Sequence, residues 1–460
     1  MTAVWTTRQV TLSATAVGAA VGLAYTLSPI TVIALPLLAT AIWWARPLGA
    51  PRERHWFFAV LALAVLTRLV VIAGLFLFAD PSQPYATLFG DELFFKNRSL
   101  WMRNVALGVP ISSADLIYAF EDVGESSYLY LLAYVQALVG AAPYGIHVMN
   151  AACYVAGVVI AYRLVRPSYG GVAALAGLVL LLFWPSLTIW SVSALKEPTY
   201  TLLAVLEFWC ALSLVRAPGW GGRLAAAASV AVSALLLESI RRGGGVVAVL
   251  GAGLGLVLAF IGNRPKVVLA TSLAAVLTAG AALTVPATQE RALTLARRSA
   301  FYHAGHVGTP GYSYQLIEPR YYIDSRRIFS MPPREAAIFV TKAVFHYFVE
   351  PLPWKAESRQ LRVYLPEQML WLMMLAFVPL GAIAGMRSDA KLTAVLLAHA
   401  GSAVLVVALN SGNFGTLIRH RGLALPYLAW LAGLGAFELL RVVSSARRTI
   451  AGGRVAHGHS

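Results

Sequence analysis

Two adjacent carboxylates, Asp91 and Glu92, follow one of the most apolar stretches of this 460-residue chain, in LFGDELFFKNR. A carboxylate near a membrane surface can serve as a general base. The structural alternative is a helix start, with Asp91 as the N-cap and Glu92 in the first turn. Adjacent residues of a helix or turn point in different directions, so we do not expect the two carboxylates to share one role.

Three short turns between apolar segments carry charged residues, and their presence there has to be explained. They are the turns in SVSALKEPTY, LESIRRGGG and NSGNFGTLIRHRG, with Lys196, Glu197, Arg241, Arg242, Arg419, His420 and Arg421. Arg binds phosphate through a bidentate fork and Lys binds it as a point charge. The turns therefore indicate an anionic ligand. Contact with lipid headgroups or with helix C-termini is the structural alternative.

The composition is that of an integral membrane protein. Only 12% of the residues are charged, whereas a soluble domain carries roughly 25%. The net charge of +16 is explained by basic cytoplasmic loops. Nucleic acid is not indicated, because no basic stripe is interleaved with aromatic residues. Cys153 and Cys210 lie in apolar segments and indicate neither a disulfide framework nor a metal site.

The apolar runs predict an all-α bundle of about 12 membrane-spanning helices, since each span needs roughly 20 apolar residues. The predicted spans are 10–28, 30–45, 57–79, 146–165, 171–191, 198–215, 224–240, 246–262, 267–285, 366–386, 391–409 and 422–441. The shorter apolar stretches 128–142 and 336–349 are expected to be interfacial or re-entrant. With the N-terminus inside, every short basic loop then falls on the cytoplasmic side.

This topology predicts five regions of the chain. They are an N-terminal two-helix hairpin (1–56), a membrane core (57–285) that includes outer loop 80–145, an outer region (286–365), C-terminal transmembrane helices (366–446) and a cytoplasmic tail (447–460). It also places Asp91, Glu92 and the three charged turns on the same outer side. Basic residues are disfavoured in short translocated turns, which favours the ligand over the structural alternative.

Four further residues carry separate expectations. Arg68 and Glu207 lie within predicted spans, where charges are costly, and a mutual ion pair is expected. His303 is a candidate for substrate contact, in a loop rather than a helix because glycines and Pro310 follow it. Tyr312 begins a Tyr-rich run that could stack on sugar rings, although Tyr is common at membrane interfaces regardless.

The order of these motifs resembles the GT-C superfamily of membrane glycosyltransferases, most closely the bacterial group similar to protein mannosyltransferases and lipid A aminoarabinose transferase. Such families carry an acidic motif in the first outer loop and an S-x-x-[KR]-[DE] motif after a span that often contains "SP". Here these are Asp91-Glu92, Ser193 with Lys196-Glu197, and Pro185-Ser186. The resemblance covers roughly 57–260. Many members have His-Pro or Pro-Pro where this chain has Glu125-Ser126-Ser127, so the acceptor stays open.

The resemblance implies transfer of a sugar from a polyprenyl-phosphate donor to a glycan, lipid or protein acceptor. The reaction would take place at the outer face of a bacterial inner membrane, with both termini cytoplasmic. Asp91 would be the general base, and Glu92 and Glu197 would contact substrate. The leaving phosphate would be held by Lys196, Arg241 and Arg242, with Arg419 and Arg421 as further candidates. No cofactor and no tight metal site are expected, and assistance by a divalent cation is left open.

Two alternatives remain. An O-antigen polymerase or ligase would depend on late basic groups such as those in SRRIF and LIRHRG instead of an early carboxylate pair. A transporter or flippase for lipid-linked saccharides predicts inverted repeats, broken helices at the midplane and charges along a path. The unusual charges of this chain gather at one face, which favours the glycosyltransferase.

Overall fold

The computed structural model describes residues 6–47, 50–78, 87–89, 91–122, 124–140, 143–261, 281, 284–308, 312–355 and 358–456. Within these residues the chain is helical and forms no β-strand beyond an isolated bridge between Ser313 and Asn413. The predicted all-α class is confirmed. Apolar side chains at helical spacing and Pro at the first position of several helices account for the elements.

The helices of the first half are α1 (Thr7–Leu27), α2 (Pro29–Ala45), α3 (Pro51–Leu77), α4 (Asp91–Ala106), α5 (Ser113–Ala119), α6 (Ser127–Val139), α7 (Pro143–Tyr169), α8 (Gly171–Phe183), α9 (Pro185–Ser191), α10 (Glu197–Arg216), α11 (Trp220–Ile240) and α12 (Gly244–Ile261). The second half contains α14 (Pro286–Gly305), α15 (Pro319–Ile323), η1 (Ser325–Ser330), α16 (Pro333–Val349), η2 (Pro353–Lys355), α17 (Arg359–Val363), α18 (Leu365–Ser388), α19 (Ala390–Asn410), α20 (Phe414–Arg421) and α21 (Leu425–Ala456).

Among the described residues, eight helices are long and apolar enough to cross a membrane. They are α3, α7, α10, α11, α12, α18, α19 and α21. A ninth candidate is the pair α8 and α9, which is bent by 62°. The protein is therefore an integral membrane protein.

The predicted count of about 12 spans is not confirmed. Helix α2 has only 17 residues, and α1 is not among the candidate spans. The predicted span 267–285 lies almost entirely outside the described residues. Helix α6 has 13 residues, too few to cross roughly 30 Å of hydrocarbon at a rise of about 1.5 Å per residue.

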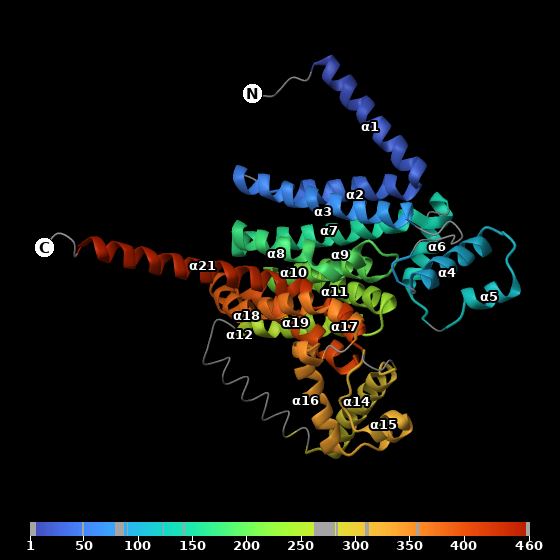
Figure 1. The fold of residues 1–460 in the computed structure, drawn as a ribbon, viewed down its shortest axis with the longest axis vertical. Coiled ribbons are helices and arrows are strands. Elements are labelled where there is room, and N and C mark those ends of the chain that lie inside the picture. Colours follow the sequence, from blue (N-terminus) through green and yellow to red (C-terminus); the bar gives the residue numbers. More distant parts are fainter. Residues whose placement is uncertain are drawn as a thin grey trace. The chain divides into compact units, whose positions relative to one another are not determined.

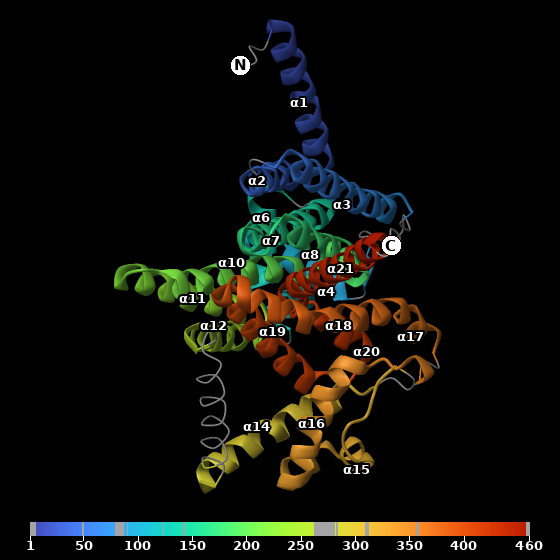
Figure 2. The same ribbon diagram turned by 90° about the vertical axis from the view of Figure 1, so that its left-hand side faces the viewer.

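The chain divides into two compact units, which we describe separately. The first contains Met1–Ile160, Thr188–Leu203 and Ser239–Arg242, and in it α4 packs on both α5 and α6 (Figure 1). The second contains Ala161–Leu187, Ala204–Glu238 and Gly243–Ser460. In that unit α12 packs on α19, and α21 packs on α8 and α18 (Figure 2).

Glycine permits the closest helix contact of the second unit. A Cβ at Gly381 of α18 would lie 1.7 Å from the carbonyl oxygen of Leu431 on α21. Small residues let helix backbones approach closely, which is a main source of packing energy between membrane helices. Any larger residue at Gly381 would force α18 and α21 apart.

Candidate functional site at the outer-loop helix

The two adjacent carboxylates have opposite environments in the structure. They open α4, where the Asp91 side chain is exposed and the Glu92 side chain is fully buried. Oε1 of Glu92 accepts hydrogen bonds from the backbone N–H groups of Leu88 and Phe89, at 2.8 and 2.9 Å. Glu92 therefore fixes the chain that enters α4, and Asp91 is the carboxylate exposed at the protein surface.

The other carboxylate oxygen of Glu92 reaches the turn that contains Lys196. Oε2 accepts a 2.8 Å hydrogen bond from the backbone N–H of Ala194. His147 of α7 lies behind this contact, with Nε2 at 3.9 Å from Oε2 and Nδ1 at 2.5 Å from the carbonyl oxygen of Val192. A carboxylate can accept several hydrogen bonds at once. One buried side chain thus joins the acidic motif to the S-x-x-K-E turn.

A buried asparagine on α7 contacts the same turn. Nδ2 of Asn150 lies within hydrogen-bond distance of the carbonyl oxygens of Ser193 and Leu195, at 2.7 and 2.8 Å, and of the Tyr128 hydroxyl, at 2.9 Å. The Tyr128 hydroxyl in turn donates to the carbonyl oxygen of Ala194. Sequence reasoning missed Asn150, although a lone Asn within the apolar VMNAACYV was the available signal.

The Arg241-Arg242 turn is attached to the start of α6. Ser126 caps that helix and its hydroxyl donates to the carbonyl oxygen of Ile240 at 2.7 Å. The hydroxyls of Ser127 and Ser239 also share a hydrogen bond of 2.7 Å. The serines that depart from the His-Pro or Pro-Pro pattern therefore connect the first outer loop to the second basic turn.

The charged side chains of the two basic turns differ in their surroundings: some contact other protein groups, and one is exposed. Arg241 Nη1 lies 3.5 Å from Oε1 of Glu197, and both side chains are mostly buried. Lys196 is half-buried with its Nζ 5.8 Å from the ring centre of Phe95, a cation–π distance. Arg242 is exposed. Within the first unit, Glu92 thus contacts the turn that contains Lys196, and Arg241 of the second basic turn reaches Glu197 beside that lysine.

Lys96 of α4 is a further charged residue that sequence reasoning missed. Its side chain is only 2% exposed and lies one helical turn after Glu92. Burial lowers the pKa of Lys96 to about 8, and attraction to the Glu92 carboxylate offsets part of this shift. Lys96 and Glu92 form a buried pair of opposite charge behind the exposed Asp91.

This pair predicts a pH dependence of stability. Between pH 8 and the usual lysine value of 10.5, the unfolded chain keeps the Lys96 proton while the folded protein loses it. The unfolded state then binds more protons, so the free energy of unfolding rises with pH across this window. Lys96→Met should remove that rise, as measured by unfolding followed through tryptophan fluorescence. Equal pH slopes for the variant and the wild type would contradict the assignment.

The candidates Arg419, Arg421, His303 and Tyr312 belong to the second unit. Arg421 is buried and donates to the carbonyl oxygens of Tyr347 and Glu350 and to Oε1 of Gln368. Its guanidinium also lies 4.7 Å from the ring centre of Trp371. These contacts engage Arg421 within the protein, so we do not assign it to phosphate. Arg419 is half-buried on α20.

His303 and Tyr312 also contact protein groups. His303 lies inside α14 and not in a loop, so that expectation was wrong. Its Nδ1 is 2.6 Å from the carbonyl oxygen of Ser411, its Nε2 is 3.0 Å from the Tyr322 hydroxyl, and burial lowers its pKa to about 4. Tyr312 is half-buried and donates to the hydroxyl of Tyr364 at 3.2 Å. Both residues therefore make contacts within the second unit.

Arg68 and Glu207, for which a mutual ion pair was expected, lie in different units, and each has contacts within its own unit. Arg68 donates to the Ser191 hydroxyl at 2.8 Å and to the carbonyl oxygen of Ala64 at 3.0 Å, within the first unit. Glu207, in the second unit, contacts His399 at 2.9 Å.

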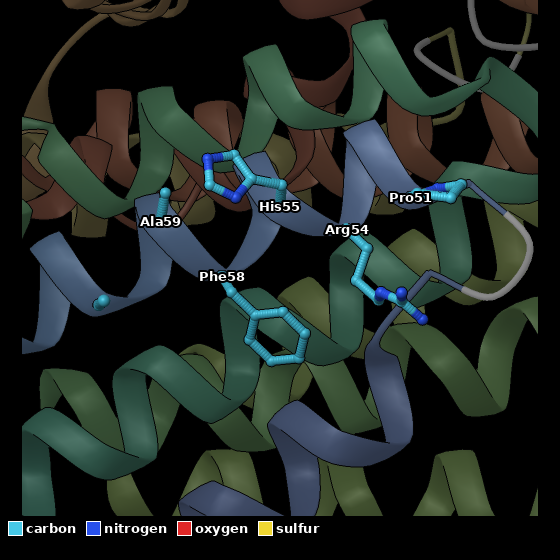
Figure 3. Close-up of a pocket in the computed structure, with 6 residues that line it drawn as sticks. Pro51, Arg54, His55, Phe58 and Ala59 are labelled. Atoms are coloured by element: carbon cyan, nitrogen blue, oxygen red, sulfur yellow. The ribbon is translucent and has the colours of Figure 1, made fainter.

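The described residues also line surface hollows. A shallow hollow of about 490 Å³ follows one helix, α3, and its lining includes Arg54, His55 and Phe58 (Figure 3). An apolar groove of about 620 Å³ lies between α11 and α12, with Glu238 on its wall. The described residues contain no group of three or more His, Cys, Asp and Glu side chains able to hold a metal ion.

Comparisons with known proteins do not identify a family for this chain. No protein-family model, no curated protein and no solved structure matches the chain. The class defined by the fold is a polytopic all-α membrane protein.

Proposed function

We propose that the protein is a membrane glycosyltransferase that uses a sugar carried on a polyprenyl phosphate and acts at the extracytoplasmic face. The acceptor would be a glycan, a lipid or a protein. The observation that carries this proposal is the hydrogen bond from the Ala194 N–H to Glu92. It joins the two motifs on which the GT-C resemblance depends, and it leaves Asp91 exposed beside them.

The proposed reaction assigns a role to Asp91 and to the cations of the two basic turns. Asp91 accepts the proton of the acceptor hydroxyl as that oxygen forms a bond to the anomeric carbon of the sugar. The bond from the anomeric carbon to the phosphate oxygen breaks, and polyprenyl phosphate leaves with the bonding electrons. Lys196 and Arg242 stabilise the negative charge that develops on the leaving phosphate. Glu197, which follows Lys196, lies 3.5 Å from Arg241 of the second basic turn.

One feature favours a lipid-linked-saccharide transporter as the second candidate. The pair α8 and α9 is a helix broken by 62°, and broken helices form the substrate sites of many transporters. In this chain the break is occupied by Glu367, which accepts hydrogen bonds from Trp184 Nε1 at 2.6 Å and from the Ser186 N–H at 2.9 Å. Because a protein carboxylate fills the helix start, we rank transport second.

Vesicles that contain the purified protein and polyprenyl-phosphate sugars separate the two candidates. A glycosyltransferase should convert the lipid to free polyprenyl phosphate when an acceptor-containing membrane extract is supplied. A transporter should move the intact lipid-linked sugar between leaflets and release no lipid phosphate. Movement without release would refute the proposed function.

A further inference from the structure

A shallow hollow along helix α3 shares no residue with the proposed sugar-transfer site. Its volume is about 490 Å³, and it is lined by Pro51, Arg54, His55, Phe58, Ala59 and Ala62 (Figure 3). These positions recur at the spacing of one face of a helix. All six residues are exposed, whereas Phe57 and Leu61 begin the buried set of α3. The hollow therefore opens to the surroundings of the protein.

The lining of this hollow changes from basic to apolar along the helix. Arg54 and His55 come first, and the sequence has no charged residue between His55 and Arg68. Helix α3 is a candidate membrane span that begins at Pro51. At a rise of about 1.5 Å per residue, the lining from Arg54 to Ala62 extends for about 12 Å. The hollow thus runs from the charged end of a span into its apolar part.

Exposed tryptophans indicate that this end of α3 lies at the membrane surface. Trp56 of α3 is 54% exposed, and Trp43 near the end of α2 is 63% exposed. Trp is enriched where hydrocarbon meets water. Arg46 follows α2, with its Cζ 4.1 Å from the ring centre of Trp43. A ligand in the hollow would therefore have its head at the membrane surface and its apolar part in the hydrocarbon.

The basic end of the hollow suits a phosphate group. The guanidinium of Arg54 can donate two parallel hydrogen bonds to phosphate oxygens. The imidazole of His55 carries at least one N–H donor in either protonation state. Glu53 is the first acidic residue of the chain, and it lies between Arg52 and Arg54. The segment therefore has an excess of positive charge, which favours an anionic ligand over a neutral one.

We propose that the hollow binds an anionic membrane phospholipid, with its phosphate at Arg54 and His55 and the first part of an acyl chain along Phe58, Ala59 and Ala62. The two alanines have short side chains, which leaves room for the acyl chain beside Phe58. A soluble anion would use the basic end alone, whereas a phospholipid uses the whole length of the lining. The ligand is thus a lipid of the surrounding membrane and not the sugar donor.

Arg54→Gln tests the head of the site. Purified, delipidated full-length protein in a neutral detergent is titrated with phosphatidylglycerol or phosphatidylcholine, and bound lipid is measured by native mass spectrometry. The wild type should prefer phosphatidylglycerol, and Arg54→Gln should weaken its binding about fivefold, the usual contribution of one basic residue near an anionic lipid. Arg52→Gln is the matched control, because Arg52 is equally exposed but does not line the hollow. Equal losses in both variants would indicate diffuse attraction and overturn the proposal.

Ala62→Phe tests the acyl-chain part of the site. The larger side chain should fill the hollow and weaken phosphatidylglycerol binding while Arg54 is unchanged. Leu63→Phe is the control, since Leu63 is 56% exposed on the same helix and does not line the hollow. Inorganic phosphate is added as a competitor. If it displaces the lipid and Ala62→Phe has no effect, the hollow binds a soluble anion and the proposal is overturned.

A labelling experiment on the wild type needs no substitution. Phosphatidylglycerol with a photoreactive group in its acyl chain should attach to α3 between Phe58 and Ala62, as located by mass spectrometry of peptides. Excess unlabelled phosphatidylglycerol should suppress this labelling, and phosphatidylcholine should suppress it less. Labelling that spares this part of α3, or that both lipids suppress equally, would overturn the proposal.

Discussion

Replacing Asp91 with Asn should lower the rate of sugar transfer by about 100- to 10,000-fold, the usual contribution of a general base. The variant should bind the lipid-linked donor as the wild type does, because the cations that meet the phosphate are unchanged. It should also fold normally, since the Asp91 side chain is exposed while Glu92 makes the buried contacts of this turn. The measurement is the initial rate of transfer from a labelled donor, with donor affinity measured in parallel.

Asp122→Asn provides the control for Asp91→Asn. Asp122 is also exposed and belongs to the same outer loop, and the proposed reaction gives it no role. The control variant should transfer sugar at the wild-type rate. A comparable loss of activity in both variants would mean that the loop responds to its total charge, and Asp91 would no longer be assigned as the base.

Replacing Glu92 with Leu should have the largest effect on stability. The change removes the acceptor for the N–H groups of Leu88, Phe89 and Ala194 and the carboxylate whose charge attracts the buried Lys96. Removing one partner of a buried charge pair typically costs about 3–5 kcal/mol. We expect the first unit to unfold at a correspondingly lower denaturant concentration.

Hydrogen exchange gives a local test of the same substitution. In Glu92→Leu the Ala194 amide loses its acceptor, so it should exchange faster than in the wild type. Asp91→Asn is the matched control, because it changes the adjacent carboxylate without touching this hydrogen bond. Unchanged exchange at Ala194 together with wild-type stability would show that Glu92 does not anchor the turn.

The sequence alone predicts the helical class, and it groups the acidic motif with the Lys196 turn that Glu92 contacts in the structure. Apolar run lengths determine the class, and the positive-inside pattern places both motifs on the same face. The sequence could not distinguish the roles of Asp91 and Glu92. Both begin one helix, and which of them is buried depends on the distant backbone of Ala194.

Arg421 and His303 show why the surroundings of the remaining candidate residues could not be predicted from the sequence. In sequence, Arg421 looks like a basic residue of an outer turn, but its acceptors are backbone carbonyls at the end of α16, about 70 residues earlier. For His303, the following glycines suggested a loop, whereas the stronger signal was Pro286 at the start of a helix that continues to Gly305.

The most direct test of the proposed function is the mass spectrum of the lipid fraction after purified wild type and Asp91→Asn are each incubated with membrane extract that contains polyprenyl-phosphate sugars. We expect free polyprenyl phosphate to appear with the wild type alone, and the mass lost by the donor to identify the sugar. Equal release by both proteins would contradict the role of Asp91. Intact donor after incubation with folded wild type and a full extract would contradict sugar transfer itself.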